Sequence, residues 1–141
     1  MHLVGPLQVS PEAISQLRQA LTVFGEVPRS RIAEEYENAD VFVLPSISEG
    51  SATVCYEALA MGLPVITTPN AGSVIRDGLD GFIVPIRDPR ALADRIATLA
   101  GDRDLLDEMS HNARLSAQNY TWDCYGQRLI DAIQQPFANA A

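Results

Sequence analysis

The chain has 141 residues, a net charge of −8, 47% hydrophobic residues and 20% charged residues. This composition is that of a folded domain rather than a disordered segment. The acidic surplus excludes nucleic acid as a bulk partner, because a phosphate backbone is bound by Lys and Arg. The two cysteines, Cys55 and Cys124, lack metal-site spacing, so we expect free core thiols in a reducing, cytoplasmic compartment. We expect no membrane segment and no signal peptide, since no apolar run approaches the roughly 20 residues of a membrane helix.

Five short apolar runs recur along the chain, and each ends near a Gly, a Pro or a polar residue. Continuous apolar runs of this length are typical of strands buried on both faces of a parallel sheet. The predicted strands cover residues 2–5, 21–25, 41–46, 64–68 and 81–85.

Helical patterns alternate with these strands and follow the last of them. Ser10 and Asp88 are predicted N-caps, each followed by Pro at the first helical position, and Gly62 is a predicted C′ residue. Strand–helix alternation predicts an α/β fold with an open, doubly wound, Rossmann-like parallel sheet in a three-layer α/β/α arrangement. With no repeat or linker, residues 1–141 are predicted to form a single domain. The predicted helices cover residues 10–21, 30–39, 51–62, 88–102, 102–118 and 121–135.

The loop after the third predicted strand is the first candidate site. Ligands of such sheets bind beyond the carboxyl ends of the strands, so Glu49 is predicted to lie at the mouth of a crevice. Gly50 and the small Ser51 let a ligand approach the backbone. The backbone amides of residues 52–54, at the start of the next helix, are a predicted anion site.

Glu57 lies inside the small, apolar helix that follows this loop. Thr53, Glu57 and Ala60 share one stripe of that helix, which is otherwise apolar and is therefore expected to be buried. A buried carboxylate needs hydrogen-bond partners or a shifted pKa, and the vicinal hydroxyls of a ribose would satisfy both its oxygens. On spacing alone, a structural Glu that bonds backbone amides or faces solvent is the favoured interpretation.

Glu49 and Glu57 are separated by seven residues, and Glu57 is followed by Ala58 and by Gly-Leu-Pro-Val at 62–65. This pattern, in ADVFVLPSISEGSATVCYEALAMGLPVITT (39–68), resembles the hallmark of the group 1 (family 4) retaining glycosyltransferases, which have the GT-B fold. Residues 76–96 resemble the family's Asp-Gly-x-x-Gly-hydrophobic-x-x-Pro segment, and Tyr-Thr-Trp at 120–122 resembles the start of its terminal helix. The resemblance covers essentially the whole chain.

The resemblance implies a nucleotide diphosphate sugar as substrate, such as a UDP- or GDP-hexose. We expect neither a metal nor another cofactor, since no His, Asp and Glu cluster has metal-ligand spacing. By the resemblance, Glu57 binds the ribose hydroxyls and Glu49 contacts the transferred sugar as the catalytic candidate. The family commonly has Phe-Gly where Ser51-Ala52 stand and often has Glu where Ser73 stands, so the sugar's identity is left open. The other residues implied in donor binding are Ser46, Gly50, Ser51, Ala52, Thr53 and Val54.

A full enzyme of this family has two Rossmann-like domains with the active site between them. We therefore expect this chain to be the C-terminal, donor-binding fragment, without the N-terminal acceptor domain that would be its partner. The first donor-domain strand, with the Arg and Lys that neutralise the diphosphate, is also expected to be missing. Arg29 or Arg31 could approach a phosphate, although a surface role is favoured. Alone, the fragment is expected to be inactive.

Three alternatives remain beside this hypothesis. One is a nucleotide-sugar epimerase of the same fold. Another is a noncatalytic binding domain that self-associates through exposed apolar surface, which size-exclusion chromatography would reveal. A dinucleotide-binding domain is disfavoured because no Gly-x-Gly-x-x-Gly follows a strand.

Overall fold

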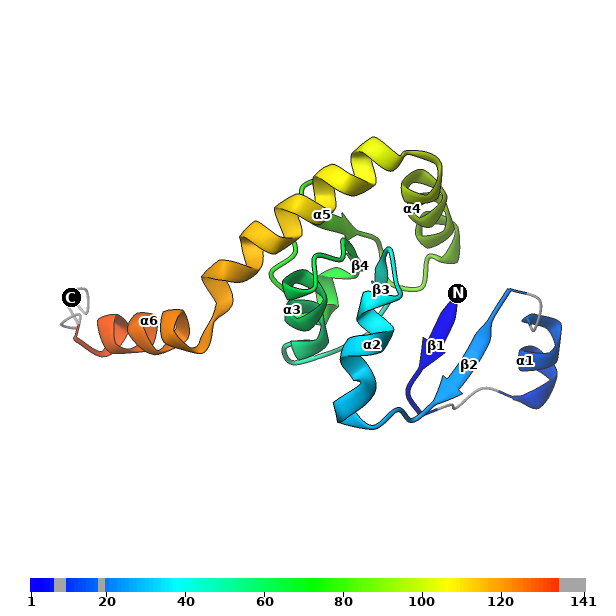
Figure 1. The fold of residues 1–141 in the computed structure, drawn as a ribbon, viewed down its shortest axis with the longest axis horizontal. Coiled ribbons are helices and arrows are strands. Elements are labelled where there is room, and N and C mark those ends of the chain that lie inside the picture. Colours follow the sequence, from blue (N-terminus) through cyan, green and yellow to red (C-terminus); the bar gives the residue numbers. More distant parts are fainter. Residues whose placement is uncertain (7–9, 18–19, 135–141) are drawn as a thin grey trace. The chain divides into compact units, whose positions relative to one another are not determined.

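The computed structural model describes residues 1–6, 10–17 and 20–134. It divides into two compact units, Met1–Asn38 and a second unit that starts at Ala39. Each unit has a parallel sheet accompanied by helices, so the predicted α/β class is confirmed (Figure 1). All five predicted strands are present, two in one sheet and three in the other. The single domain over residues 1–141 stays a prediction.

The first unit is built on two parallel strands that pair from His2 opposite Thr22. The amide of Ala13 donates to Ser10 Oγ at 3.3 Å, so Ser10 caps the first helix as predicted. The elements are β1 (His2–Val4), α1 (Pro11–Leu17), β2 (Thr22–Gly25), the 3₁₀ turn η1 (Arg29–Arg31) and α2 (Ile32–Glu37).

The second unit contains a parallel sheet with the strand order β3-β4-β5. Leu44 pairs with Thr67, and Thr67 pairs with Ile83, so the three strands end at the same edge. The elements are β3 (Phe42–Leu44), α3 (Thr53–Ala60), β4 (Val65–Thr67), η2 (Pro69–Ala71), β5 (Gly81–Ile83), α4 (Pro89–Gly101), α5 (Arg103–Ala117), η3 (Gln118–Tyr120) and α6 (Trp122–Gln134).

Helices α3 and α4 pack on opposite faces of this sheet. Ile66 joins a core cluster with Leu99 of α4, whereas the next residue, Thr67, hydrogen-bonds through its side chain to Cys55 of α3. Successive residues of a strand point to opposite faces, so the sheet has one helix layer on each side. Leu92, Ile96 and Leu99 of α4 face this core, and Asp88 caps the helix by accepting from the amide of Ala91 at 2.9 Å.

Helix α5 runs along the amino edge of the sheet and forms a hydrogen bond with a residue just before each strand. Arg103 Nη1 donates to Asp40 Oδ1 (3.1 Å) before β3, and Ser110 Oγ donates to the carbonyl of Gly62 (2.6 Å) before β4. Ser116 Oγ donates to the fully buried Asp80 (2.7 Å) before β5. The opposite, carboxyl edge is left to the loops that carry the predicted site.

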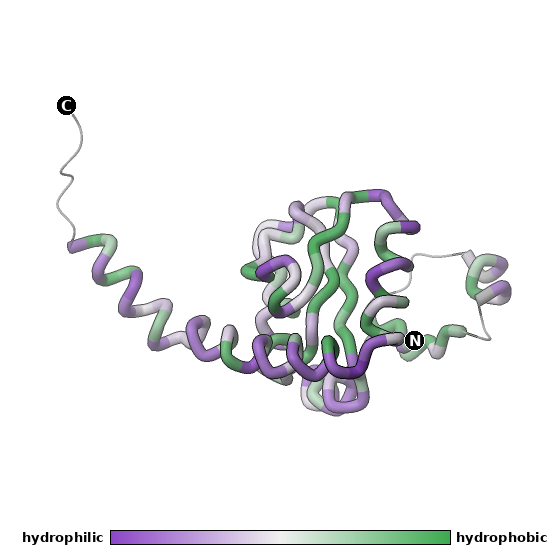
Figure 2. Tube along the Cα trace, turned by 90° about the horizontal axis from the view of Figure 1, so that it is seen from above, coloured by the Kyte–Doolittle hydropathy of each residue, from purple (hydrophilic) through white to green (hydrophobic). Residues whose placement is uncertain are grey.

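Helix α6 exposes most of its large apolar side chains. Trp122 is 87% exposed and Ile133 is 73% exposed, with Tyr125 and Leu129 on the same side of the helix. Figure 2 shows this mixture of hydrophobic and hydrophilic residues along the helix that leads to the C-terminus, in contrast to the hydrophobic central strands. In the part of the chain that the structure describes, no helix is long and apolar enough to cross a membrane.

Candidate functional site

The predicted site loop, residues 45–52, leaves the carboxyl end of β3 and is bonded to the segment that leaves β4. Thr68 Oγ1 donates to the carbonyl of Ser46 at 2.5 Å. Asn70 Nδ2 donates to the carbonyl of Ile47, and the amide of Glu49 donates to the carbonyl of Asn70, both at 2.9 Å. Glu49 is exposed beyond the strand end, where the sequence places it.

Gly72 brings the two segments into close contact. Its φ is +58°, a conformation that favours glycine. A Cβ at this position would overlap the carbonyl oxygen of Gly50 and approach the Cα of Ser51. Only a residue without a side chain fits here unless the loop moves, so Gly72 is a structural requirement of the site.

The start of α3 differs in part from the predicted anion site. The helix begins at Thr53 rather than near Ser51, and the amide of Ala52 donates to the carbonyl of Ala71 at 3.1 Å. The prediction that the Ala52 amide is available to a ligand is therefore wrong. The N-cap residue Ala52 has no side-chain acceptor. The amides of Gly50, Ser51 and Thr53 form no hydrogen bond with other described residues, so unused donors remain.

Glu57 lies in the middle of α3 and is half-buried. Its stripe is not buried, because Thr53 and Ala60 are exposed, whereas Cys55 and Leu59 on the other side are fully buried. The expectation that this helix is buried all round is wrong, since only its inner face packs on the sheet. The carboxylate at position 57 therefore stands on the outward face of the helix that follows the Glu49 loop.

Ser46 and Cys55 lie close to Glu49. Ser46 Oγ donates to Glu49 Oε1 over a long 3.4 Å. Burial raises the pKa of the Cys55 thiol to about 11. Side-chain hydrogen bonding with Thr67 and Ser73 lowers this pKa in part, and the charge of Glu49 raises it further. The thiol is thus held neutral beneath the site and is not a nucleophile at neutral pH.

Sequence reasoning did not find Thr68 as part of the site. Thr68 directly follows a predicted strand, and polar residues at that place are the ones that carboxyl-edge sites use. That signal could have identified it. No sequence signal paired its hydroxyl with Ser46, because the two residues are 22 positions apart.

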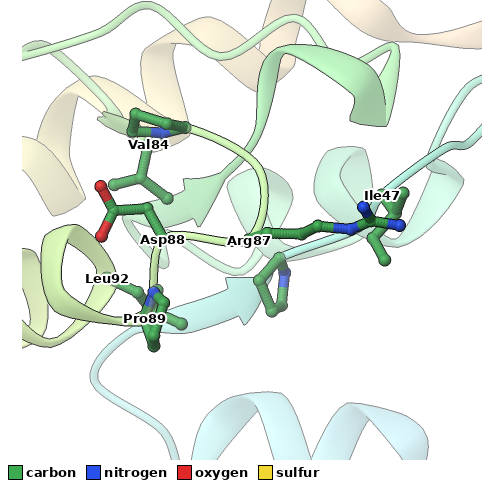
Figure 3. A pocket seen from close by; sticks show the side chains of 8 residues that line it. Ile47, Val84, Arg87, Asp88, Pro89 and Leu92 are labelled. Carbon is green, nitrogen blue, oxygen red and sulfur yellow. The ribbon is translucent and has the colours of Figure 1, made fainter.

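A shallow pocket of about 250 Å³ lies elsewhere on the same edge, between the loop after β3 and the start of α4. In Figure 3 the Arg87 side chain extends toward Ile47, while the Asp88 carboxylate points the other way. Neither Glu49 nor Glu57 lines this pocket, although Pro45 and Ile47 of the site loop do, so it adjoins the predicted site without including its carboxylates. Its lining is mostly apolar and consists of Pro45, Ile47, Val84, Pro85, Arg87, Asp88, Pro89 and Leu92.

No metal site is formed by the described ranges. Across residues 1–6, 10–17 and 20–134, no group of three or more His, Cys, Asp and Glu side chains is placed to hold a metal ion. A reaction without metal stays a prediction.

A parallel sheet with helices on both faces is the fold of the donor-side unit of GT-B glycosyltransferases, and known structures of that class match this chain. Sucrose-phosphate synthase from Thermosynechococcus elongatus aligns with a TM-score of 0.79 at 26% identity, covering 97% of this chain and 38% of that one. Anabaena HepE in complex with UDP aligns with a TM-score of 0.77 at 21% identity, covering 96% and 40%.

The chain belongs to the family of group 1 glycosyl transferases, whose model matches residues 1–102. A curated relative, the D-inositol 3-phosphate glycosyltransferase of Geodermatophilus obscurus, is 33% identical over all of this chain and 32% of its own length. The chain spans 29% to 32% of the length of three of the curated relatives that it matches.

Proposed function

We propose that this chain is the C-terminal, donor-binding part of a retaining glycosyltransferase. The whole enzyme transfers a hexosyl unit from a nucleotide diphosphate sugar to an acceptor hydroxyl. One observation carries the proposal: Glu49 and Glu57 flank the uncapped start of α3 at the carboxyl edge of a parallel sheet. Family membership supports it, as does the fold shared with HepE, which has been crystallised with UDP and with UDP-glucose.

The diphosphate is assigned to the start of α3, because this helix lacks the cap that its neighbours have. Asp88 and Asp102 accept hydrogen bonds from the first turns of α4 and α5, whereas Ala52 offers no acceptor at the corresponding place in α3. An uncapped first turn leaves amide donors and the positive end of the helix dipole facing outward. Both favour a phosphate. Of the amides that have no partner among the described residues, those of Thr53 and Ser51 lie nearest to this first turn in sequence, followed by that of Gly50.

The two carboxylates are assigned to hydroxyl groups on either side of the diphosphate. Glu57 accepts from the ribose hydroxyls, one turn beyond the helix start. Glu49, with Ser46 beside it, accepts from hydroxyls of the transferred sugar and is the catalytic candidate. Ser51 and Val54 complete the donor contacts through a side chain or backbone. Ala52 is left out, because its side chain is buried and its amide donates to the carbonyl of Ala71. We propose no covalent protein nucleophile, in keeping with the high pKa of the buried Cys55 thiol.

The remaining parts of the cleft are proposed to come from the rest of the enzyme. The chain spans about a third of its relatives, and a leaving diphosphate needs cations in the transition state. Arg31 bonds to Glu34 at 3.2 Å and Arg103 bonds to Asp40 at 3.1 Å, so both of these cations are engaged. The isolated chain is therefore proposed to bind the donor without transferring the sugar. Sugar transfer by this chain alone would contradict that statement.

The test is a titration of isotope-labelled chain with UDP, GDP and ADP, followed by NMR. We expect shifts clustered at residues 49–57 and a preference for one base. Glu57→Gln should weaken nucleotide binding roughly tenfold or more, because a hydrogen bond to a charged group contributes about 1.5–3 kcal/mol. Glu108→Gln, on the exposed side of α5, is the matched control and should bind normally. Equal affinity of the Glu57 variant and the control would disprove the assignment.

A second candidate function is a noncatalytic interaction domain, and the exposed face of α6 favours it. Trp122, Tyr125, Leu129 and Ile133 form an exposed apolar stripe, and contiguous exposed apolar surface is typical of interaction sites. If this stripe mediates self-association, size-exclusion chromatography should show a concentration-dependent dimer that Trp122→Ser abolishes. A monomer at all concentrations, together with nucleotide binding, would leave donor binding as the function.

A further inference from the structure

We propose that Asn70 is a positioning residue for Glu49, which it holds by bonding the site loop on both sides of Ser48. The inference rests on the proposed function, in which the Glu49 carboxylate contacts the donor sugar. Asn70 itself reaches neither the sugar nor the nucleotide in this proposal. It acts through the backbone of the loop that carries Glu49.

Asn70 uses its side chain and its main chain on the same short stretch of loop. Its Nδ2 donates to the carbonyl of Ile47 at 2.9 Å, and its carbonyl accepts from the amide of Glu49 at 2.9 Å. One residue thus forms hydrogen bonds with positions 47 and 49 of a segment more than 20 residues away in sequence. With both ends held, the peptide units on either side of Ser48 have little freedom to rotate, which sets the direction in which the Glu49 side chain leaves the backbone.

Apart from the close approach of Gly72 to Gly50 and the long bond from Ser46 Oγ to Glu49, little else restrains the loop at this point. Ile47, its large apolar side chain, is 53% exposed, so burial does not anchor it. Ser48, Gly50 and Ser51 are also exposed. A loop rich in Ser and Gly has high conformational entropy when it is unrestrained. The position of this loop therefore depends on hydrogen bonds to the neighbouring segment, and not on burial of apolar side chains.

Neighbouring bonds keep the two segments in register around Asn70. Thr68 Oγ1 bonds to the carbonyl of Ser46 on one side, and the amide of Ala52 bonds to the carbonyl of Ala71 on the other. These contacts hold the ends of the loop, at the strand and at the helix. Asn70 is the residue that bonds its middle, where the catalytic candidate lies.

The affinities for the nucleotide and for the attached sugar should change differently when the Asn70 hydrogen bonds are lost. Glu57 and the start of α3, which are assigned to the nucleotide, lie outside residues 47–49, the part of the loop that Asn70 bonds. Glu49, which is assigned to the sugar, lies inside it. Loss of the Asn70 side chain should therefore weaken binding of UDP-glucose and spare binding of UDP, whereas a general loss of structure would weaken both.

The test compares Asn70→Ala with Asn112→Ala in the full chain. Asn112 Nδ2 also donates to a loop carbonyl, that of Leu79 at 3.2 Å, but at the amino edge of the sheet. In Asn70→Ala we expect hydrogen exchange of the Glu49 amide to quicken roughly fivefold. UDP-glucose affinity should fall by a similar factor, and UDP affinity should stay within about twofold. Asn112→Ala should change neither the exchange nor the affinities.

Unchanged exchange of the Glu49 amide in Asn70→Ala would overturn the positioning role, as would an equal loss of UDP and UDP-glucose affinity. Failure of the proposed function has a different signature, because the unaltered chain would then bind none of UDP, GDP and ADP, with or without the attached sugar. In that case Asn70 cannot position Glu49 for a donor sugar, even if the Glu49 amide exchanges faster in Asn70→Ala. If the unaltered chain prefers another base, that nucleotide and its glucose conjugate replace UDP and UDP-glucose in the test.

Discussion

Replacing Gly72 by Ala tests the close packing on which the site depends. The added Cβ has two consequences in this structure. It places an L-residue at φ +58°, and it overlaps the carbonyl oxygen of Gly50, which is backbone and cannot rotate away. Relief requires the site loop to move away from the segment after β4.

The expected loss of stability follows from these two effects. A left-handed conformation costs an L-residue about 1 kcal/mol relative to Gly. Moving the loop strains or breaks the bonds from the amides of Glu49 and Ala52 to the carbonyls of Asn70 and Ala71, and each contributes about 1 kcal/mol. Gly72→Ala should therefore lower the free energy of unfolding by about 3 kcal/mol.

Gly78→Ala is the matched control. Gly78 has a φ of +78° and open space where its Cβ would lie, so only the conformational cost of about 1 kcal/mol applies. Urea unfolding of both variants and the parent chain would measure the difference, expected to be about 2 kcal/mol. If the two variants lose equal stability, the contact between Gly72 and Gly50 does not restrain the loop.

Two further predictions concern buried groups. The pKa of the Cys55 thiol is about 11 in the folded chain, compared with an ordinary value of 9.0. Between these values the folded chain keeps a proton that the unfolded chain loses. The free energy of unfolding should therefore fall as the pH rises from about 9 to 11. The loss should reach about 2–3 kcal/mol in the parent chain and should be smaller in Cys55→Ala. Urea unfolding at several pH values would measure both. Parallel pH profiles for the two chains would contradict this prediction. Asp80→Ala should cost about 3–5 kcal/mol in urea unfolding, because the fully buried Asp80 carboxylate accepts from Ser116 Oγ and from the amide and Nε of Arg76, each at 2.7 Å. Asp77→Ala, which removes one exposed bond to the amide of Ile83, should cost only about 1 kcal/mol, and a similar loss in both would refute the role given to burial.

Local features of this protein were predictable because their causes lie within a few residues. Ser10 and Asp88 cap their helices through bonds to amides three positions ahead, a spacing visible in any sequence. The strands were predictable because their side chains are apolar without interruption. The motif spacing from Glu49 to Glu57 placed both carboxylates on one loop–helix segment, which is where the structure has them.

Predictions failed where a distant segment intervened. The amide of Ala52, a predicted donor, is used by Ala71, and the start of α3 moves from Ser51 to Thr53. The outward face of α3 was predicted to be buried, because small residues such as Ala60 are compatible with either environment. Composition does not say which side of a weakly amphipathic helix meets the sheet.

The sequence alone therefore determined the class of fold, the order of strands and helices, and the segment that carries the paired carboxylates. Each of these depends on periodicity, capping or motif spacing along one stretch of chain. Only the tertiary structure decided which amides remain for a ligand and how Asn70 and Gly72 hold the Glu49 loop. The physical reason is that these contacts join groups about 20 residues apart, and at least one partner in each is a backbone group. Backbone groups are the same in every residue, so the residue types carry no record of which groups pair.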